Sequence, residues 1–83
     1  MLQTVQVRYY AQLREALKTS KEEVSLELPA LEGEILERLA QMHPKQRDLF
    51  MASRVAVDDG YVDAHAQLQG FTGVDIISPV SGG

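Results

Sequence analysis

The last six residues of the chain have the types and spacing that point most directly to chemistry. They read Ser78-Pro79-Val80-Ser81-Gly82-Gly83. With glycine near 7% of residues, a final glycine pair arises by chance in only about one chain in 200. Because Gly82 and Gly83 carry no side chains, another protein's active site can closely approach their backbone and the Gly83 carboxylate. Pro79 favours an extended path, so we expect a tail shaped to enter a narrow channel in a partner.

A carboxylate at Gly83 needs activation before it can take part in group transfer. As an ion it is a poor electrophile, because its resonance and its charge both resist attack. A mixed anhydride with AMP would supply a leaving group, and a sulfur nucleophile would then give a thiocarboxylate. Gly70 and Gly73 do not open a helix, so no phosphate-binding loop is present and the ATP chemistry would belong to another protein. The other interpretation of the tail is an ordinary frayed chain end.

No other group of residues predicts a site. The sequence has no cysteine, which excludes disulfides and thiolate catalysis. His43 and His65 are far apart in the sequence and no third ligand accompanies them, so we expect no metal. Asp58, Asp59 and Asp63 lack the alternating oxygen ligands of a calcium loop, and a tight turn explains them.

Charge and apolar content exclude several classes of protein. In 83 residues, eight Lys and Arg stand against twelve Asp and Glu, and there is no Trp. Nucleic-acid binding needs a basic footprint and often stacked aromatic rings, so we expect no nucleic-acid partner. No apolar run approaches a membrane span and no signal segment opens the chain. We therefore expect a cytoplasmic protein without membrane contact, formed of one domain.

Hydrophobic periodicity predicts the elements that position the tail. Val5, Val7 and Tyr9 alternate with polar residues, as in a half-buried strand, whereas the spacing of Leu13 and Leu17 indicates a short helix. The expected order is a strand over 4–9, a helix over 10–18, a strand over 24–28, a helix over 35–42, a strand over 54–57, a hairpin turn at 58–60 leading into 61–62, and a strand over 74–77. One long amphipathic helix facing a small mixed sheet is an α+β arrangement. We expect the domain to span residues 1–77 and a flexible tail to span 78–83.

Several segments together resemble a known family. They are Tyr9-Tyr10-Ala11-Gln12-Leu13-Arg14-Glu15 after the first strand, Leu39 to His43-Pro44 at the end of the main helix, Val55-Ala56-Val57 with Tyr61-Val62 in the hairpin, and Leu68 through Val74 to the terminal Pro79-Val80-Ser81-Gly82-Gly83. The chain resembles the MoaD/ThiS sulfur carriers over nearly its whole length. Within that family it is similar to the MoaD branch, whose members form the small subunit of molybdopterin synthase. The terminal pentapeptide is the most specific part of the likeness.

The resemblance implies a ubiquitin-like β-grasp fold and a carrier role. It implies that a ubiquitin-activating-type adenylyltransferase uses ATP to adenylylate Gly83, and that a sulfur-donor protein then supplies a thiocarboxylate. The tail would enter the large subunit of molybdopterin synthase, where cyclic pyranopterin monophosphate receives the sulfur in molybdenum cofactor biosynthesis. The chain itself would bind no cofactor and catalyse nothing alone. A heterotetramer of two small and two large subunits is the implied assembly.

The likeness also assigns expected roles to residues near the end of the chain. Gly83 would carry the sulfur and Gly82 would give it a slender approach. We expect Pro79, Val80 and Ser81 to line the partner's groove. An outward sheet face that includes Ile77 and Phe71 would supply an apolar docking patch.

The sequence departs from the family pattern at a few positions. Ser78 replaces the first proline of a frequent Pro-Pro pair, Phe71 stands where Gly is common, and Asp58 stands where Asn is common. The main helix also lacks the usual Ser or Thr cap. These departures affect the stiffness of the tail and local stability, and they remove no group that the transfer needs.

Three other functions remain open at this point. A thiamine-pathway sulfur carrier uses the same tail chemistry, although those chains are usually shorter and lack the helix around Leu13 and Leu17. A ubiquitin-like protein modifier would share the activation and join Gly83 to a lysine through an isopeptide bond. A pure interaction domain would leave the tail inert.

Overall fold

The structure, a computed structural model, describes residues 1–58 and 60–79. Within these ranges, five strands form one sheet, accompanied by three α-helices and a short 3₁₀ helix. In chain order the elements are β1 (Leu2–Tyr10), α1 (Ala11–Leu17), β2 (Lys21–Glu27), α2 (Glu32–Met42), the 3₁₀ helix η1 (Pro44–Gln46), α3 (Arg47–Met51), β3 (Arg54–Val57), β4 (Gly60–Tyr61) and β5 (Gly73–Ile77).

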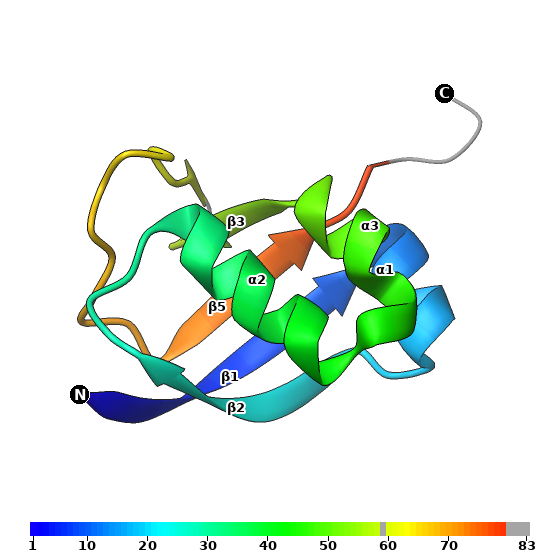
Figure 1. The fold of residues 1–83 in the computed structure, drawn as a ribbon, viewed down its shortest axis with the longest axis horizontal. Coiled ribbons are helices and arrows are strands. Elements are labelled where there is room, and N and C mark those ends of the chain that lie inside the picture. The colour runs from blue at the N-terminus through cyan, green and yellow to red at the C-terminus, as the bar shows by residue number, and fades with distance from the viewer. Residues whose placement is uncertain (59, 80–83) are drawn as a thin grey trace.

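β1 and β5 form a parallel pair at the centre of the sheet. The strand order is β2-β1-β5-β3-β4, and the other neighbouring strands are antiparallel. In the parallel pair, Val7 lies opposite Val74 and Tyr10 lies opposite Ile77. The first and last strands therefore end on the same side of the domain, away from Met1, as their arrowheads in Figure 1 show.

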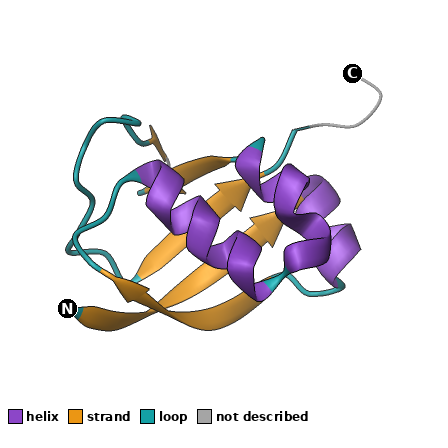
Figure 2. Cartoon of the chain, in the orientation of Figure 1, coloured by secondary structure: helices purple, strands orange, loops and turns teal. Residues whose placement is uncertain are grey.

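The core lies between the sheet and the helices. α2 and α3 cover one face of the sheet, and α1 follows β1 at the far end (Figures 1 and 2). The alternation predicted from the sequence is confirmed, because Val5, Val7 and Tyr9 are all buried. α2 adds one apolar stripe, while Leu13 of α1 and Phe50 of α3 are fully buried beside it.

The predicted strands and the two predicted helices are present, together with the 3₁₀ helix η1 and the short helix α3. α2 begins without a Ser or Thr cap, and the Glu34 carboxylate instead accepts a hydrogen bond from the Leu31 N–H at 2.8 Å. α2 ends before Pro44, as predicted. No element is predicted over 44–53, where η1 and α3 occur, because a five-residue helix is too short to show a periodic apolar face.

The β3–β4 hairpin follows the predicted turn. Val57 pairs with Gly60, so two residues connect the strands. Asp58, the first of them, has a φ of 54°, the left-handed geometry that Asp tolerates well and that tight hairpins require. Asp59 lies outside the described residues.

A polar cluster joins β1, β2 and the end of α2. The Tyr9 hydroxyl donates a hydrogen bond to the Glu22 carboxylate, and His43 Nε2 lies 2.7 Å from the same oxygen. The imidazole ring also stacks on Phe50, with ring centroids 5.9 Å apart. His43, predicted at the helix C-terminus, is the C-cap residue of α2. Its contact with Glu22 connects the end of this helix to the sheet.

The buried Tyr9 hydroxyl should make the fold sensitive to alkaline pH. Burial, followed by the hydrogen bond to Glu22 and the negative charge of Glu22, raises the pKa of Tyr9 above its ordinary value. Above about pH 10 the tyrosine of the unfolded chain loses its proton while Tyr9 in the folded chain keeps it. The folded state then binds more protons, so the free energy of unfolding falls as pH rises further. We expect Tyr9→Phe to remove this part of the fall.

Urea unfolding between about pH 8 and 11 measures this effect. Tyr61→Phe is the matched control, since Tyr61 is 63% exposed, and it should keep the alkaline loss of the unaltered chain. An alkaline loss of the same size in Tyr9→Phe would contradict the assignment.

Candidate functional site

β5 brings the chain to the surface at the end of the domain where α1 begins. Ile77, the last residue of β5, lies between Tyr10 of β1 and Arg54 of β3. Pro79 is exposed two residues later. The remaining predicted site residues, Val80, Ser81, Gly82 and Gly83, lie outside the described part of the chain.

Ser78 belongs to the domain and not to a free tail. It is only 3% exposed. Its hydroxyl donates a hydrogen bond to the carbonyl of Tyr10 at 2.9 Å and accepts one from the N–H of Leu13 at 3.3 Å. The predicted domain boundary after Ile77 therefore moves by one residue, because Ser78 satisfies two backbone groups at the start of α1.

An apolar patch lies beside the exit of the chain, on the sheet face away from the core. We call it the tail-side patch, and its residues are Tyr10, Ala56, Tyr61, Asp75 and Ile77. Tyr10 and Tyr61 are 40% and 63% exposed. Isolated exposed apolar side chains are common, but here two aromatic rings and an isoleucine share one surface. The patch is the only group of exposed aromatic rings in residues 1–58 and 60–79.

Asp75 connects the tail-side patch to the centre of the sheet. Its Oδ1 accepts a hydrogen bond from Arg8 Nε at 2.6 Å and another from the Tyr10 hydroxyl at 3.2 Å. The Asp75 side chain is 15% exposed, so the Arg8 charge compensates it in a partly dry environment. This shared oxygen fixes the Tyr10 ring at the edge of the patch.

Arg54 supports the other side of the patch. Its guanidinium lies over the Tyr61 ring, 5.2 Å from the ring centroid, in a cation–π geometry. The same group donates to Glu32 Oε2 at 3.0 Å and to the Val62 carbonyl at 3.0 Å. Glu32 is buried in the first turn of α2, and its Oε2 also accepts the Val55 N–H at 2.8 Å. A carboxylate on the helix side thus holds an arginine that positions an aromatic ring on the open side.

Of the two residues expected on an outward face, one lies there and the other is buried. Ile77 lines the tail-side patch, as predicted. Phe71 is only 7% exposed and packs in the hydrophobic core, so the outward position expected for it is wrong. It follows Gly70, whose φ of 78° lets the chain turn before β5 and directs the next side chain inward.

Sequence reasoning missed both tyrosines of the patch. Alternation along β1 could have found Tyr10, because Tyr9 points into the core and its neighbour must point out. Tyr61 reaches the patch only through the pairing of β4 with β3, where it lies opposite Ala56. The turn at 58–60 predicts the hairpin, but the two residues of β4 are too few to show which face of the sheet Tyr61 occupies.

Of the residues weighed earlier as metal ligands, Asp59 lies outside the described part of the chain. Among the described residues, no group of three or more His, Cys, Asp or Glu side chains could hold a metal ion. His65 is exposed in the loop before β5, where its N–H donates to Asp63 Oδ1 at 2.8 Å. That contact is a local turn and explains the aspartate without a ligand.

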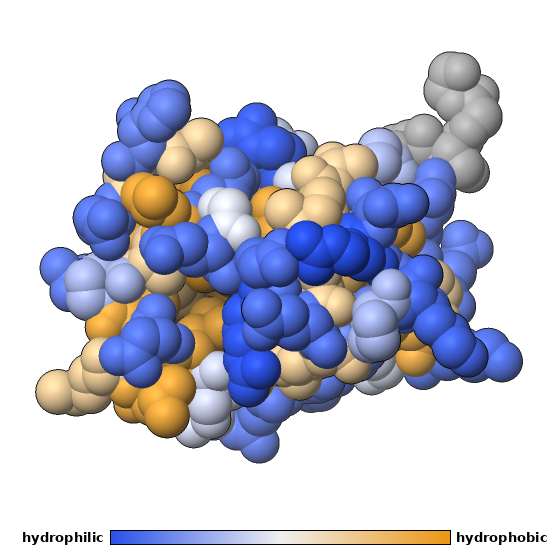
Figure 3. Space-filling model, in the orientation of Figure 1, coloured by the Kyte–Doolittle hydropathy of each residue, from blue (hydrophilic) through white to orange (hydrophobic). Residues whose placement is uncertain are grey.

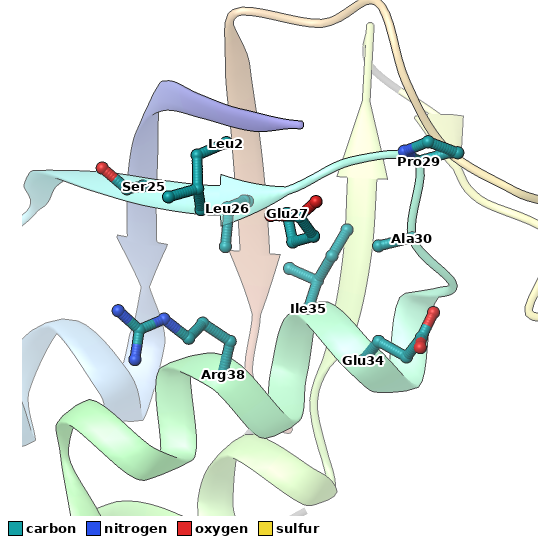
Figure 4. Close-up of a pocket in the computed structure, with 9 residues that line it drawn as sticks. All are labelled: Leu2, Ser25, Leu26, Glu27, Pro29, Ala30, Glu34, Ile35 and Arg38. Atoms are coloured by element: carbon teal, nitrogen blue, oxygen red, sulfur yellow. The ribbon is translucent and has the colours of Figure 1, made fainter.

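A second apolar groove lies between β2 and α2, at the opposite end of the sheet from Ser78. Figure 4 shows Leu26 and Ile35 facing each other across it, with Glu34 and Arg38 on the helix side. In Figure 3 apolar surface gathers toward this end, whereas hydrophilic residues cover most of α2 and α3. Leu2 at the start of β1 lines this groove, so the groove is remote from Ser78 and is not part of the tail-side patch.

The order of elements, the central parallel pair and the one-sided helical layer define a ubiquitin-like β-grasp domain, as the sequence analysis predicts. The sequence model of the ThiS family matches residues 7–83, which is nearly the entire chain. The chain therefore belongs to the ThiS family and is a sulfur carrier of the ThiS/MoaD type.

Solved structures agree with this fold. SAMP1 from Haloferax volcanii is 18% identical, covers 98% of this chain and 100% of its own, and gives a TM-score of 0.74. A putative molybdopterin converting factor subunit 1 from Pyrococcus furiosus is 25% identical. The match covers 93% of this chain and 98% of that one, with a TM-score of 0.71. The complex of subunits 1 and 2 of molybdopterin-converting factor from Helicobacter pylori contains a chain that is 20% identical, and this match covers 98% of our chain and 100% of that one, with a TM-score of 0.57.

No curated protein matches the sequence. In the part of the chain that the structure describes, no helix is both long and apolar enough to cross a bilayer.

Loss of the Glu32 carboxylate should weaken the support of the tail-side patch and the fold together. Glu32→Ala leaves the buried Val55 N–H without its acceptor and removes the partner of Arg54. We expect the free energy of unfolding to fall by about 2 kcal/mol. Glu32→Gln keeps an oxygen that can accept the Val55 N–H, so its loss should be smaller. Urea unfolding of both variants gives the comparison, and equal losses would mean that the carboxylate bonds are not the cause.

Proposed function

We propose that this chain is the sulfur carrier and small subunit of a molybdopterin synthase. In this proposal the carboxylate of Gly83 receives, holds and delivers the sulfur. The observation that carries the proposal is that the sequence model of the ThiS family matches this chain through residue 83. In the fold, β5 ends beside the tail-side patch with its exposed aromatic rings. We expect this sulfur transfer to take place in the cytoplasm.

The proposed loading reaction needs two steps, the first at a carboxylate oxygen of Gly83 and the second at its carbonyl carbon. A ubiquitin-activating-type adenylyltransferase joins the carboxylate to AMP from ATP and releases pyrophosphate. With sulfide as the nucleophile, a C–S bond then forms, the C–O bond to AMP breaks, and AMP leaves. A sulfur-donor protein would supply the sulfur in the cell. The carrier contributes a narrow, side-chain-free terminus and binds no cofactor of its own.

The proposed delivery reaction takes place in a partner. The large subunit of molybdopterin synthase receives the tail. Sulfur passes to cyclic pyranopterin monophosphate, the C–S bond to Gly83 breaks, and water supplies the oxygen that returns Gly83 to a carboxylate. The resemblance to subunit 1 of the molybdopterin-converting factor, one example of which is seen with its subunit 2, supports this partner. A heterotetramer of two small and two large subunits is the assembly we expect.

Helix α1 favours the molybdopterin role over the thiamine role. Thiamine-pathway carriers usually lack the helix after the first strand, and here α1 is present with Leu13 fully buried. A protein-modifier role shares the activation step and differs only in the acceptor. An assay that offers the pterin precursor and a lysine-bearing protein separately distinguishes the two.

Incubation with the activating enzyme, ATP and sulfide should replace one oxygen by sulfur at the C-terminus. Mass spectrometry of the C-terminal peptide measures that exchange. One alanine added after Gly83 should abolish loading, because the reacting carboxylate is displaced from the enzyme's active site. The melting temperature of this extended chain should stay unchanged. Sulfur gained elsewhere, or not at all, would refute the carrier role.

The tail-side patch should be the docking surface for the large subunit. Tyr61→Ser removes an exposed aromatic ring from the patch, and we expect binding to weaken by about tenfold or more. Leu2→Ser is the matched control, because Leu2 is 68% exposed against 63% for Tyr61 and lies at the other end of the sheet. Isothermal titration calorimetry measures both. If only Leu2→Ser weakens binding, docking occurs at the groove between β2 and α2.

A further inference from the structure

The first turn of α1 is capped from the other end of the sequence. Tyr10, the N-cap residue of α1, gives no side-chain cap. The N–H groups of a first turn lack partners within their helix, and a serine at the cap commonly accepts one of them. Ser78 takes that role here, since its hydroxyl accepts the Leu13 N–H from 65 residues away. The same hydroxyl donates to the Tyr10 carbonyl, which closes the contact on both sides.

This cap fixes the point from which the C-terminal segment departs. Ile77 is held in the sheet between β1 and β3, and Ser78 is held at its side chain by two backbone groups. The next residue, Pro79, has a restricted φ and also restricts the backbone of Ser78. Hydrogen bonds therefore orient one residue and a covalent ring orients the next.

We propose that Ser78 is a positioning residue for sulfur transfer: by capping α1 it fixes the backbone that leads into Pro79, the last described residue before the reacting terminus. The inference rests on the proposed function, because orientation of Gly83 toward an enzyme's reacting atoms is the property at stake. A backbone already fixed at Ser78 and Pro79 lowers the entropy lost when the chain end is bound in a channel. Ser78 does not touch the reacting atoms, so its effect passes through the backbone of Pro79.

A double-mutant cycle in the full-length chain separates positioning from simple stabilisation. The variants are Ser78→Ala, Pro79→Gly and their combination, and the readout is the rate of sulfur loading by the activating enzyme. With Pro79 present, Ser78→Ala should lower kcat/KM by on the order of tenfold, mainly through KM. In the Pro79→Gly background, where the backbone at residue 79 is already unrestricted, Ser78→Ala should change kcat/KM little. The fall in melting temperature from Ser78→Ala should be the same in both backgrounds.

Gln3→Ala is the control for loss of a structural hydrogen bond. Gln3 Nε2 donates to the Phe71 carbonyl at 3.0 Å, near the start of β1 and far from Ser78. This variant should lower the melting temperature and leave the KM for loading unchanged. Circular dichroism at the assay temperature gives the folded fraction of each variant, so that rates refer to folded protein only.

The outcomes distinguish this inference from the proposed function. An equal loss of kcat/KM in both backgrounds, or a loss that matches the unfolded fraction, would make Ser78 a cap for α1 and nothing more. Loading of Ser78→Ala at the rate of the unaltered chain would overturn the positioning role while leaving the carrier role intact. No thiocarboxylate on the unaltered chain would refute the carrier role, and the inference would fall with it.

Discussion

The parallel pairing of β1 with β5 is the interaction on which the rest of the structure depends. It places the first and last strands side by side at the centre of the sheet, so that both end on one side of the domain. The start of α1, the exit of the chain and the tail-side patch are brought together there by this register. Because β5 is also paired with β3, the chain leaves from an internal strand with neighbours on both sides. An edge strand would have a neighbouring strand on one side only.

Three carboxylates connect the elements around this frame, and each serves two donors. Glu22 accepts from Tyr9 and lies beside His43, and Asp75 accepts from Arg8 and Tyr10. Glu32 accepts from the Arg54 guanidinium and from a backbone N–H of β3. A small domain buries a limited share of its surface, so shared polar contacts of this kind matter for joining its layers. Two of the three lie around the tail-side patch, where they orient its exposed rings.

Local patterns in the sequence predict the elements well and their partners poorly. The alternation in β1 and the apolar stripe of α2 follow directly from periods of two and 3.6, and both are confirmed. Helix α3 shows no period because it has only five residues. Phe71 has only Gly and Thr around it, so its inward direction depends on the turn at Gly70, which local patterning does not specify.

The candidate site shows the same division between composition and geometry. The slender, extended tail expected from the sequence follows from residue types alone, since glycine lacks a side chain and proline restricts φ on any backbone. The burial of Ser78 could not be predicted, because its two partners lie in the first turn of α1, far away in the sequence. Tyr61 likewise depends on strand pairing and on an arginine held by a carboxylate from the opposite layer.

The place of β5 between β1 and β3 has a consequence for biosynthesis. β5 is the last of the five strands to be synthesised, yet β1 and β3 can be joined only through it. A nascent polypeptide interrupted before residue 73 leaves the apolar sides of β1 and β3 uncovered, and such exposed strands are prone to aggregation and proteolysis. The complete sheet can therefore form only after translation has passed β5.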